Sequence, residues 1–251
     1  MDSELSAYFD DDGERRAYEA FLAEQERGGE DFALDAPALV CRWRMRAKHV
    51  PLLNRHIRAL SQRRVNGEPC SHNMLSWAKQ HVEWSLSEGA YAERDGVLML
   101  VIDVNGNAAM TVGAYEPLAD TSREALACRA ATSRAEESVT GIAPELLGAV
   151  APDGAVLLAA APDERLCGAA TLAEQLATTR GRDVRRALAP SEGGPARDLE
   201  AFLAAAGSGA AVFLVSDEHG VVPAAENDAD ADPEAASFAA FLSEGVRKLF
   251  A

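Results

Sequence analysis

The chain has 251 residues, 48% apolar and 25% charged, which is typical of a globular protein with one or two domains. No apolar run approaches the roughly 20 residues that cross a bilayer, and no signal peptide is evident, so we expect a cytoplasmic protein without a membrane partner. The net charge of −16 argues against nucleic acid as a partner. The four cysteines form no CxxC pair, which argues against a zinc knuckle, a redox motif and a disulfide scaffold.

The charge changes sign between the first two segments of the chain. Residues 1–35 hold 12 acidic residues and three arginines, whereas residues 36–67 hold eight Lys or Arg and no acid. Apolar residues three and four positions apart predict a short amphipathic helix over residues 13–27. The basic segment is either an anion pocket or a surface that the acidic arm covers. The opposed charges predict that the arm docks on it.

The first half then predicts a strand, two helices and a hairpin. Residues 38–46 alternate apolar side chains with arginines, which is the period of a strand. Residues 51–60 and 72–87 have the apolar spacing of helices. Strand-like runs over residues 97–104 and 108–115 flank an Asn-Gly pair, which is a strong hairpin signal.

The second half repeats these kinds of element. They are, in chain order, a hairpin of residues 145–150 and 155–161, a helix over 168–179, a strand over 184–188, a helix over 198–206 with Asp198 as its N-cap, a strand over 210–216 and a helix over 233–250. Because strands alternate with helices in both halves, we expect an α/β (α+β) fold in two subdomains.

This pattern divides the chain into three predicted segments. Residues 1–37 form an acidic N-terminal arm with a short helix, residues 38–118 an N-terminal α/β subdomain and residues 119–251 a C-terminal α/β subdomain. We expect the two subdomains to meet near residues 116–123, which contain Pro117 and a polar run and where the pattern of elements changes.

Four stretches of the chain resemble motifs of one known family and occur in the same order as in that family. They are the helix over residues 51–60 with His56, the hairpin around Asn105-Gly106, the turn and helix start LCGAAT at residues 166–171, and VFLVSDEHGVVP at residues 212–223. Together they resemble the class IV aminotransferases, the pyridoxal phosphate (PLP) enzymes of fold type IV. That family includes branched-chain and D-amino acid aminotransferases and aminodeoxychorismate lyase. The resemblance implies a two-subdomain D-amino acid aminotransferase-like fold and a homodimer.

The chain departs from this family where the cofactor chemistry lies. In the family, PLP forms a Schiff base with a lysine that follows the linker, but this chain has only Lys48, Lys79 and Lys248. The acidic partner of the pyridine nitrogen aligns with Gly141. The arginine that holds the phosphate aligns with Ala59.

The resemblance leaves a vestigial anion site at the start of one helix. It comprises Arg58, Gly168, Ala169, Ala170 and Thr171. In the closing turn the hydroxyl positions of the family hold Val215 and Asp217, and a carboxylate close to a phosphate repels it. PLP is implied by the resemblance alone. Because the lysine and the arginine that would hold it are absent and Asp217 would repel its phosphate, we expect no cofactor.

The sequence thus predicts a degenerate class IV aminotransferase-like protein without transaminase activity and without catalytic residues. No metal is expected, since no two histidines have the i, i+4 spacing of a helical zinc site. Two alternatives stay open. One is an active PLP-dependent aminotransferase or lyase acting on a small amino acid, with Lys48 or Lys79 as the nucleophile; the other is an unrelated α/β protein that binds a partner. The expected partners are a second copy of the chain and a small anionic ligand in the residual cleft.

Overall fold

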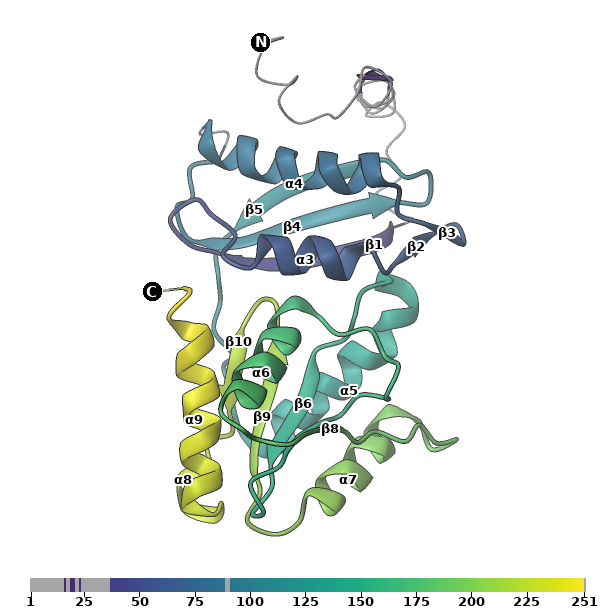
Figure 1. Ribbon diagram of the computed structural model, residues 1–251. Helices are drawn as coiled ribbons and strands as arrows, with labels where there is room; N and C mark the ends of the chain where they lie inside the picture. Colours follow the sequence, from purple (N-terminus) through teal and green to yellow (C-terminus); the bar gives the residue numbers. More distant parts are fainter. Residues whose placement is uncertain (1–15, 17–18, 21–22, 24–36, 89–90, 251) are drawn as a thin grey trace.

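The computed structural model describes residues 37–88 and 91–250, together with Arg16, Glu19, Ala20 and Ala23. The predicted acidic arm, its helix over residues 13–27 and its docking fall almost wholly outside the described residues. The described chain forms two bodies, one stacked on the other (Figure 1). None of the described helices is long and apolar enough to cross a bilayer.

The N-terminal body is an antiparallel sheet covered by two helices on one face. Its strands are β1 (Pro37–Met45), β4 (Gly96–Asp103) and β5 (Ala108–Gly113), in the order β1-β4-β5. The helices are α3 (Leu53–Leu60) and α4 (His72–Ser87), and a short ribbon of β2 (Arg64–Val65) and β3 (Glu68–Pro69) lies between them in the chain. The alternate residues Cys41, Trp43 and Met45 of β1 are buried in this core, which confirms the predicted strand and its apolar face.

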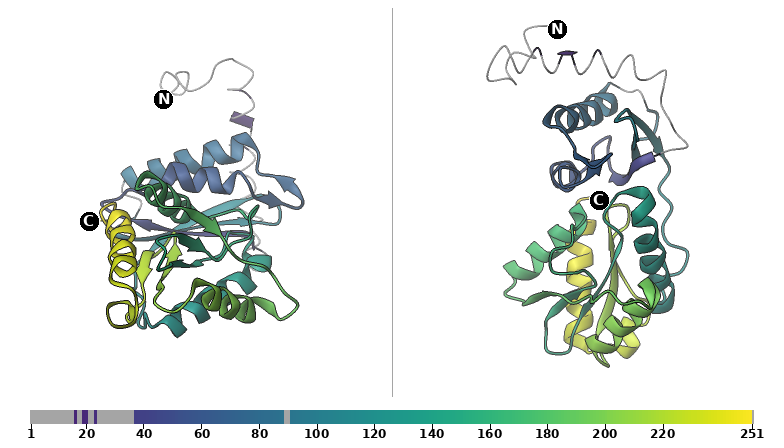
Figure 2. Two further views of the ribbon diagram at one scale, coloured as in Figure 1. Left: turned by 60° about the horizontal axis from the view of Figure 1, so that its bottom comes forward. Right: turned by 90° about the vertical axis from the view of Figure 1, so that its right-hand side faces the viewer.

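The C-terminal body is a sheet between two layers of helices (Figure 2). Its strands are β6 (Leu146–Val150), β7 (Val156–Leu158), β8 (Val184–Arg186), β9 (Ala211–Ser216) and β10 (Gly220–Pro223), in the order β10-β9-β6-β7-β8. Helices α6 (Gly168–Thr179) and α9 (Pro233–Arg247) pack on one face. Helices α5 (Arg123–Thr140) and α7 (Gly194–Ala206) pack on the other, and α8 (Asn227–Asp230) is a single turn. Residues 114–122, which join the two bodies, form neither helix nor strand.

Both predicted hairpins are confirmed, whereas in the second half one prediction is wrong and one helix was not predicted. Asp198 is not an N-cap: α7 begins at Gly194, and Asp198 is buried inside it, where its carboxylate accepts hydrogen bonds from the N–H and hydroxyl groups of Ser191. Helix α5 was not predicted, because its alanines and arginines carry little apolar periodicity. The sequence does mark the ends of this helix. The Ser122 side chain caps its N-terminus, and Gly141 ends it with a backbone in the left-handed region, at a φ of +63°.

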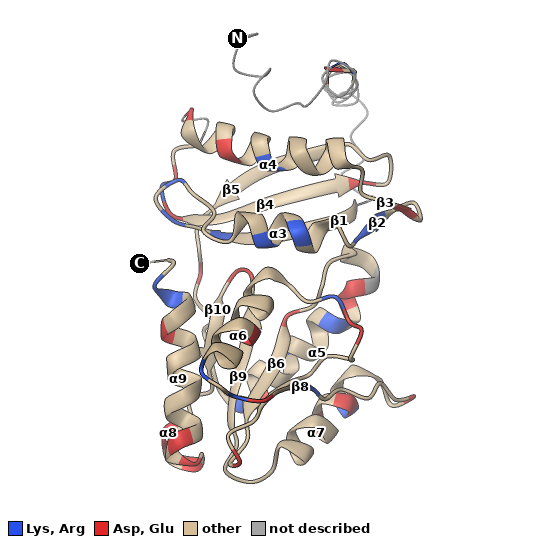
Figure 3. Cartoon of the chain, viewed as in Figure 1, with Lys and Arg blue, Asp and Glu red and all other residues tan. Residues whose placement is uncertain are grey.

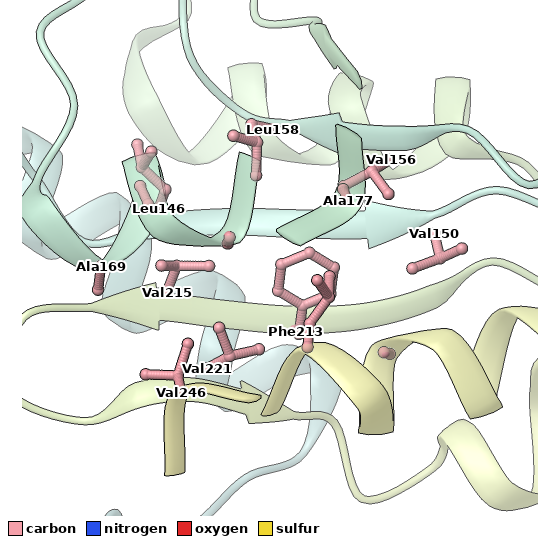
Figure 4. Packing of buried hydrophobic residues seen from close by; sticks show 14 of the residues in the cluster. Leu146, Val150, Val156, Leu158, Ala169, Ala177, Phe213, Val215, Val221 and Val246 are labelled. Carbon is pink, nitrogen blue, oxygen red and sulfur yellow. The ribbon is translucent and has the colours of Figure 1, made fainter. Parts of the chain in front are cut away.

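The C-terminal core closes around Phe213 on β9 (Figure 4). Gly148 on β6 lies directly opposite this ring in the sheet register. A Cβ at Gly148 would lie 2.3 Å from a ring carbon of Phe213, whose side chain is fully buried. Because Gly148 has no side chain, the Phe213 ring can pack directly against β6 at this position.

This packing predicts that Gly148→Ala destabilises the protein by about 1–3 kcal/mol, because the buried ring must move. The matched control is Gly113→Ala on β5, where an added Cβ meets nothing within 4 Å. Urea unfolding of the two variants measures the difference in the free energy of unfolding. Equal stability of both variants would contradict this packing.

Candidate functional site between the two subdomains

Three consecutive residues, Asp217, Glu218 and His219, form the turn between β9 and β10. The Ser216 Oγ accepts a hydrogen bond from the His219 N–H at 2.8 Å, and Gly220 ends the turn with a φ of +74°. A left-handed backbone at this point favours glycine. The turn lies against the N-terminal subdomain, because the Arg44 N–H of β1 donates to the Asp217 carbonyl at 3.0 Å.

The Asp217 carboxylate sits at the N-terminus of α6. Its Oδ1 accepts from the Ala169 N–H at 2.7 Å and its Oδ2 from the Gly168 N–H at 3.3 Å. The same Oδ2 lies 3.0 Å from His56 Nδ1 of α3. The side chain of Asp217 is only 13% exposed. One carboxylate thus joins the first turn of α6 to the N-terminal subdomain.

Asp217 is held in its ionised form. Burial raises the pKa of this carboxyl, but the charge and contact of His56 and the amides of Ala169 and Gly168 outweigh burial. The net pKa lies below its usual value of 3.8. The free N–H groups and the positive end of the helix dipole both favour an anion at this point. Burial first, and then the charge of Asp217, raise the pKa of the nearby thiols of Cys41 and Cys167.

His56 is oriented by its surroundings. Its ring stacks on Trp43 with centroids 5.0 Å apart and an interplanar angle of 5°. A Cβ at Gly168 would lie 2.6 Å from His56 Nδ1, so only glycine lets α6 approach this closely. The helical spacing of residues 51–60 puts His56 on a flanking face, but the structure buries it to 2% exposure because α6 covers that side of α3.

The other two residues of the turn hold further partners. Glu218 accepts two hydrogen bonds from Arg42, at 2.6 Å from Nε and 2.8 Å from Nη2. His219 lies 3.0 Å from Arg129 Nη2 of α5 through its Nε2, and 3.3 Å from the hydroxyl of Tyr115 through its Nδ1. Burial lowers the pKa of His219 to about 4, so its ring is neutral at pH 7.

Beside this turn lies a cavity of about 610 Å³, which we name the inter-subdomain cleft. Its walls come from β1, from α5 and the segment that follows it, and from the ends of α6 and β9. They carry two arginines, four carboxylates, hydroxyls, thiols and apolar side chains: Val40, Arg42, Trp43, Ala125, Cys128, Arg129, Thr132, Ser133, Glu136, Thr140, Ile142, Ala143, Pro144, Glu145, Cys167, Ser216, Asp217 and Glu218. Both arginines are paired, Arg42 with Glu218 and Arg129 with Glu145 at 2.6 Å.

The structure divides the five residues of the predicted anion site between two places. The backbone amides of Gly168 and Ala169 are bonded to Asp217, and Ala170 is fully buried. Arg58 and Thr171 instead line a separate cavity of about 300 Å³ on the other side of α3 and α6.

The partners of four site residues do not follow from the sequence: His56, Arg42, Glu218 and His219. The acidic pair followed by His in SDEHG was the available signal, but nothing in it shows which partners the turn meets. Among the described residues no group of three or more His, Cys, Asp or Glu is arranged to hold a metal ion.

No protein family matches the sequence of this chain, and no curated protein matches it. Among solved structures, the PLP-bound form of a hypothetical aminotransferase from Mycobacterium tuberculosis matches with a TM-score of 0.54 at 13% identity, over 84% of this chain and 89% of that one. Its form with α-ketoglutarate and PMP matches with a TM-score of 0.52 at 13% identity, over 85% and 90%. The 4-amino-4-deoxychorismate lyase from Pseudomonas aeruginosa matches with a TM-score of 0.48 at 16% identity, over 84% and 90%.

The chain has the fold of the fold type IV aminotransferases. The predicted fold class and the resemblance to structures of this family are therefore confirmed.

The residues at the start of α6 do not fit the cofactor of that family. By the resemblance, the first amides of this helix would hold the PLP phosphate, but here they are bonded to an ionised carboxylate of the chain itself. A phosphate dianion at this place would meet Asp217 instead of free donors. None of the three lysines lines the inter-subdomain cleft: Lys48 Nζ donates to the Tyr91 carbonyl, Lys79 lies on α4 and Lys248 lies 4.0 Å from Glu244.

The lowered pKa of Asp217 predicts a pH dependence of stability. Above pH 3.8 the carboxylate is ionised in both the folded and the unfolded chain, so its full stabilising contribution is present. As the pH falls through 3.8 and on to the lower folded-state pKa, the unfolded chain takes up the proton first and the contribution is lost. Asp217→Asn should therefore cost stability at pH 6 and cost progressively less at the acidic end.

Urea unfolding of the wild type and the variant at each pH measures this difference. Asp228→Asn on α8, an exposed carboxylate, is the control and should show no such trend. A cost of Asp217→Asn that stays constant down to the acid limit would contradict an ionised Asp217 in the folded protein.

Proposed function

We propose that this chain is a non-transaminating protein on the fold type IV scaffold. In this proposal Asp217 takes the place of the cofactor phosphate, and the inter-subdomain cleft binds a small molecule without PLP. The observation that carries the proposal is the Asp217 carboxylate on the Gly168 and Ala169 amides.

Electrostatics supports the loss of the cofactor. A helix N-terminus has a limited number of free N–H donors, and an internal anion that uses two of them leaves fewer for a second anion and repels it. The internal carboxylate is covalently part of the chain, so it does not dissociate. An incoming phosphate would have to displace Asp217 from two amides and from His56 together.

The number and positions of the lysines support the loss of transaminase activity. Transamination needs an amine that forms the Schiff base and then moves a proton, and a lysine performs both steps. Lys48, Lys79 and Lys248 are the only lysines of the chain, and all three lie away from the cleft walls. Without an amine at the cleft, the scaffold holds no nucleophile of this kind.

The charge of the cleft indicates the kind of ligand it would take. Four carboxylates line it, those of Glu136, Glu145, Asp217 and Glu218, against the two guanidinium groups of Arg42 and Arg129. This excess of negative charge disfavours the small anion that the sequence led us to expect there. A neutral or cationic small molecule with an apolar part suits the mixed walls better. The homodimer and the cytoplasmic location stay predictions.

The proposal predicts that adding PLP to the purified protein produces no internal aldimine. Visible absorbance should not shift, and borohydride reduction should leave no added mass on any lysine. Lys48→Ala, Lys79→Ala and Lys248→Ala should behave as the wild type does, because none of these amines reaches the cleft. Absorbance spectra and intact-mass spectrometry measure both readouts.

Turnover of an amino acid and a keto acid by the unmodified protein would overturn the proposal. If Lys48→Ala or Lys79→Ala abolished that turnover, the chain would be an active PLP-dependent enzyme with an unusual nucleophile. A reduced adduct on one lysine without turnover would equally contradict the loss of the cofactor.

A further inference from the structure

A second cavity, of about 300 Å³, lies outside the inter-subdomain cleft where α3 meets α6. Four arginines from three parts of the chain line it. Arg55 and Arg58 come from α3, Arg165 from the segment before α6 and Arg186 from β8. Figure 3 shows basic residues along α3 where the two bodies face each other. We name this cavity the arginine pocket.

Two of these guanidinium groups are held in place by neighbours. Arg55 donates to Thr171 Oγ1 at 3.1 Å and to Gln175 Oε1, so its fork spans from α3 to α6. Arg186 donates to both carboxylate oxygens of Glu174 and to the carbonyls of Pro162 and Glu164. Their positions are therefore fixed before any ligand arrives, which lowers the entropy cost of binding.

The other two guanidinium groups have no partner among the described residues. Within the part of the chain that the structure describes, the side chains of Arg58 and Arg165 make no hydrogen bond or ion pair, and both residues are exposed. The acids of the pocket do not balance them. Glu164 is paired with Arg134 at 3.0 Å, which leaves the exposed Asp163 alone.

The balance of charges in the arginine pocket indicates the chemical class of its ligand. Arg186 is neutralised by Glu174, so Arg55, Arg58 and Arg165 stand against Asp163, an excess of two positive charges. The chain as a whole carries −16, so this excess is a local reversal of sign. Guanidinium forks bind carboxylates and phosphates through paired hydrogen bonds. We propose that the arginine pocket binds a small metabolite with two oxyanion groups, either a diphosphate or a polycarboxylate.

This inference does not rest on the proposed function. The arginine pocket and Asp217 use different groups of α6, since the Gly168 and Ala169 amides face Asp217 while the Thr171 side chain faces the pocket. The site would serve equally well on an active or an inactive scaffold.

Isothermal titration calorimetry with pyrophosphate in one arm and citrate in the other tests the proposal, at an ionic strength held constant with sodium chloride. At least one probe should bind, and the arm that binds more tightly gives the oxyanion class. The double variant Arg58→Ala/Arg165→Ala should weaken that binding by about tenfold or more. Asp163→Asn should strengthen it by about two- to fivefold, because it removes the one opposing charge.

Two controls keep the result specific. Arg247→Ala removes an exposed arginine of α9 that is paired with Glu244, and it should leave the affinity unchanged. Asp228→Asn on α8 removes an exposed carboxylate outside the pocket and should also leave the affinity unchanged, which shows that Asp163→Asn does not act through the net charge alone. Thermal unfolding of each variant verifies its fold. The absence of binding in both arms, or equal loss in Arg58→Ala/Arg165→Ala and in Arg247→Ala, would overturn the proposal.

Discussion

The contact between the Asp217 carboxylate and the first amides of α6 is the interaction on which the rest of this structure depends. A helix begins with N–H groups that no other residue of the helix can satisfy, and here an internal anion satisfies two of them. The same carboxylate meets His56 of the other subdomain at 3.0 Å, where the His56 side chain is buried and that of Asp217 nearly so. A nearly buried charge is stable only with such partners. Removal of one partner leaves a charge or a hydrogen-bonding group without compensation in the interior, which lowers the stability of the fold.

The turn that carries Asp217 also joins the two subdomains. Its backbone carbonyl accepts from β1, Glu218 pairs with Arg42, and His219 lies against Arg129 and Tyr115. These contacts form one wall of the inter-subdomain cleft, so cleft shape and subdomain orientation depend on the same turn. A ligand that moved this turn would have to break contacts to β1, α3 and α6 together. This coupling is why the same residues bear on both the stability and the proposed binding role of the protein.

Much of the fold could be predicted from the sequence, and less of the site. Alternating apolar residues in β1 and the Asn-Gly turn are local signals, and both predictions are confirmed. Helix α5 was missed because its buried face is built from alanines with few large apolar residues. The resemblance alone already places Asp217 close to the start of α6. Its bonds to the amides and to His56 could not be predicted, because they join residues 48 or more positions apart, and only the packing of α6 on α3 brings them together.

The most direct measurement of the central claim follows the backbone amide resonances of Gly168 and Ala169 by ¹⁵N NMR while PLP is added at neutral pH. If Asp217 occupies these amides, neither resonance of the wild type should shift in a saturable way. In Asp217→Thr, which frees the amides and removes the repelling charge, both should shift and saturate. Saturable shifts of both resonances in the unmodified protein would contradict the account, because they would place a phosphate where the structure has a carboxylate.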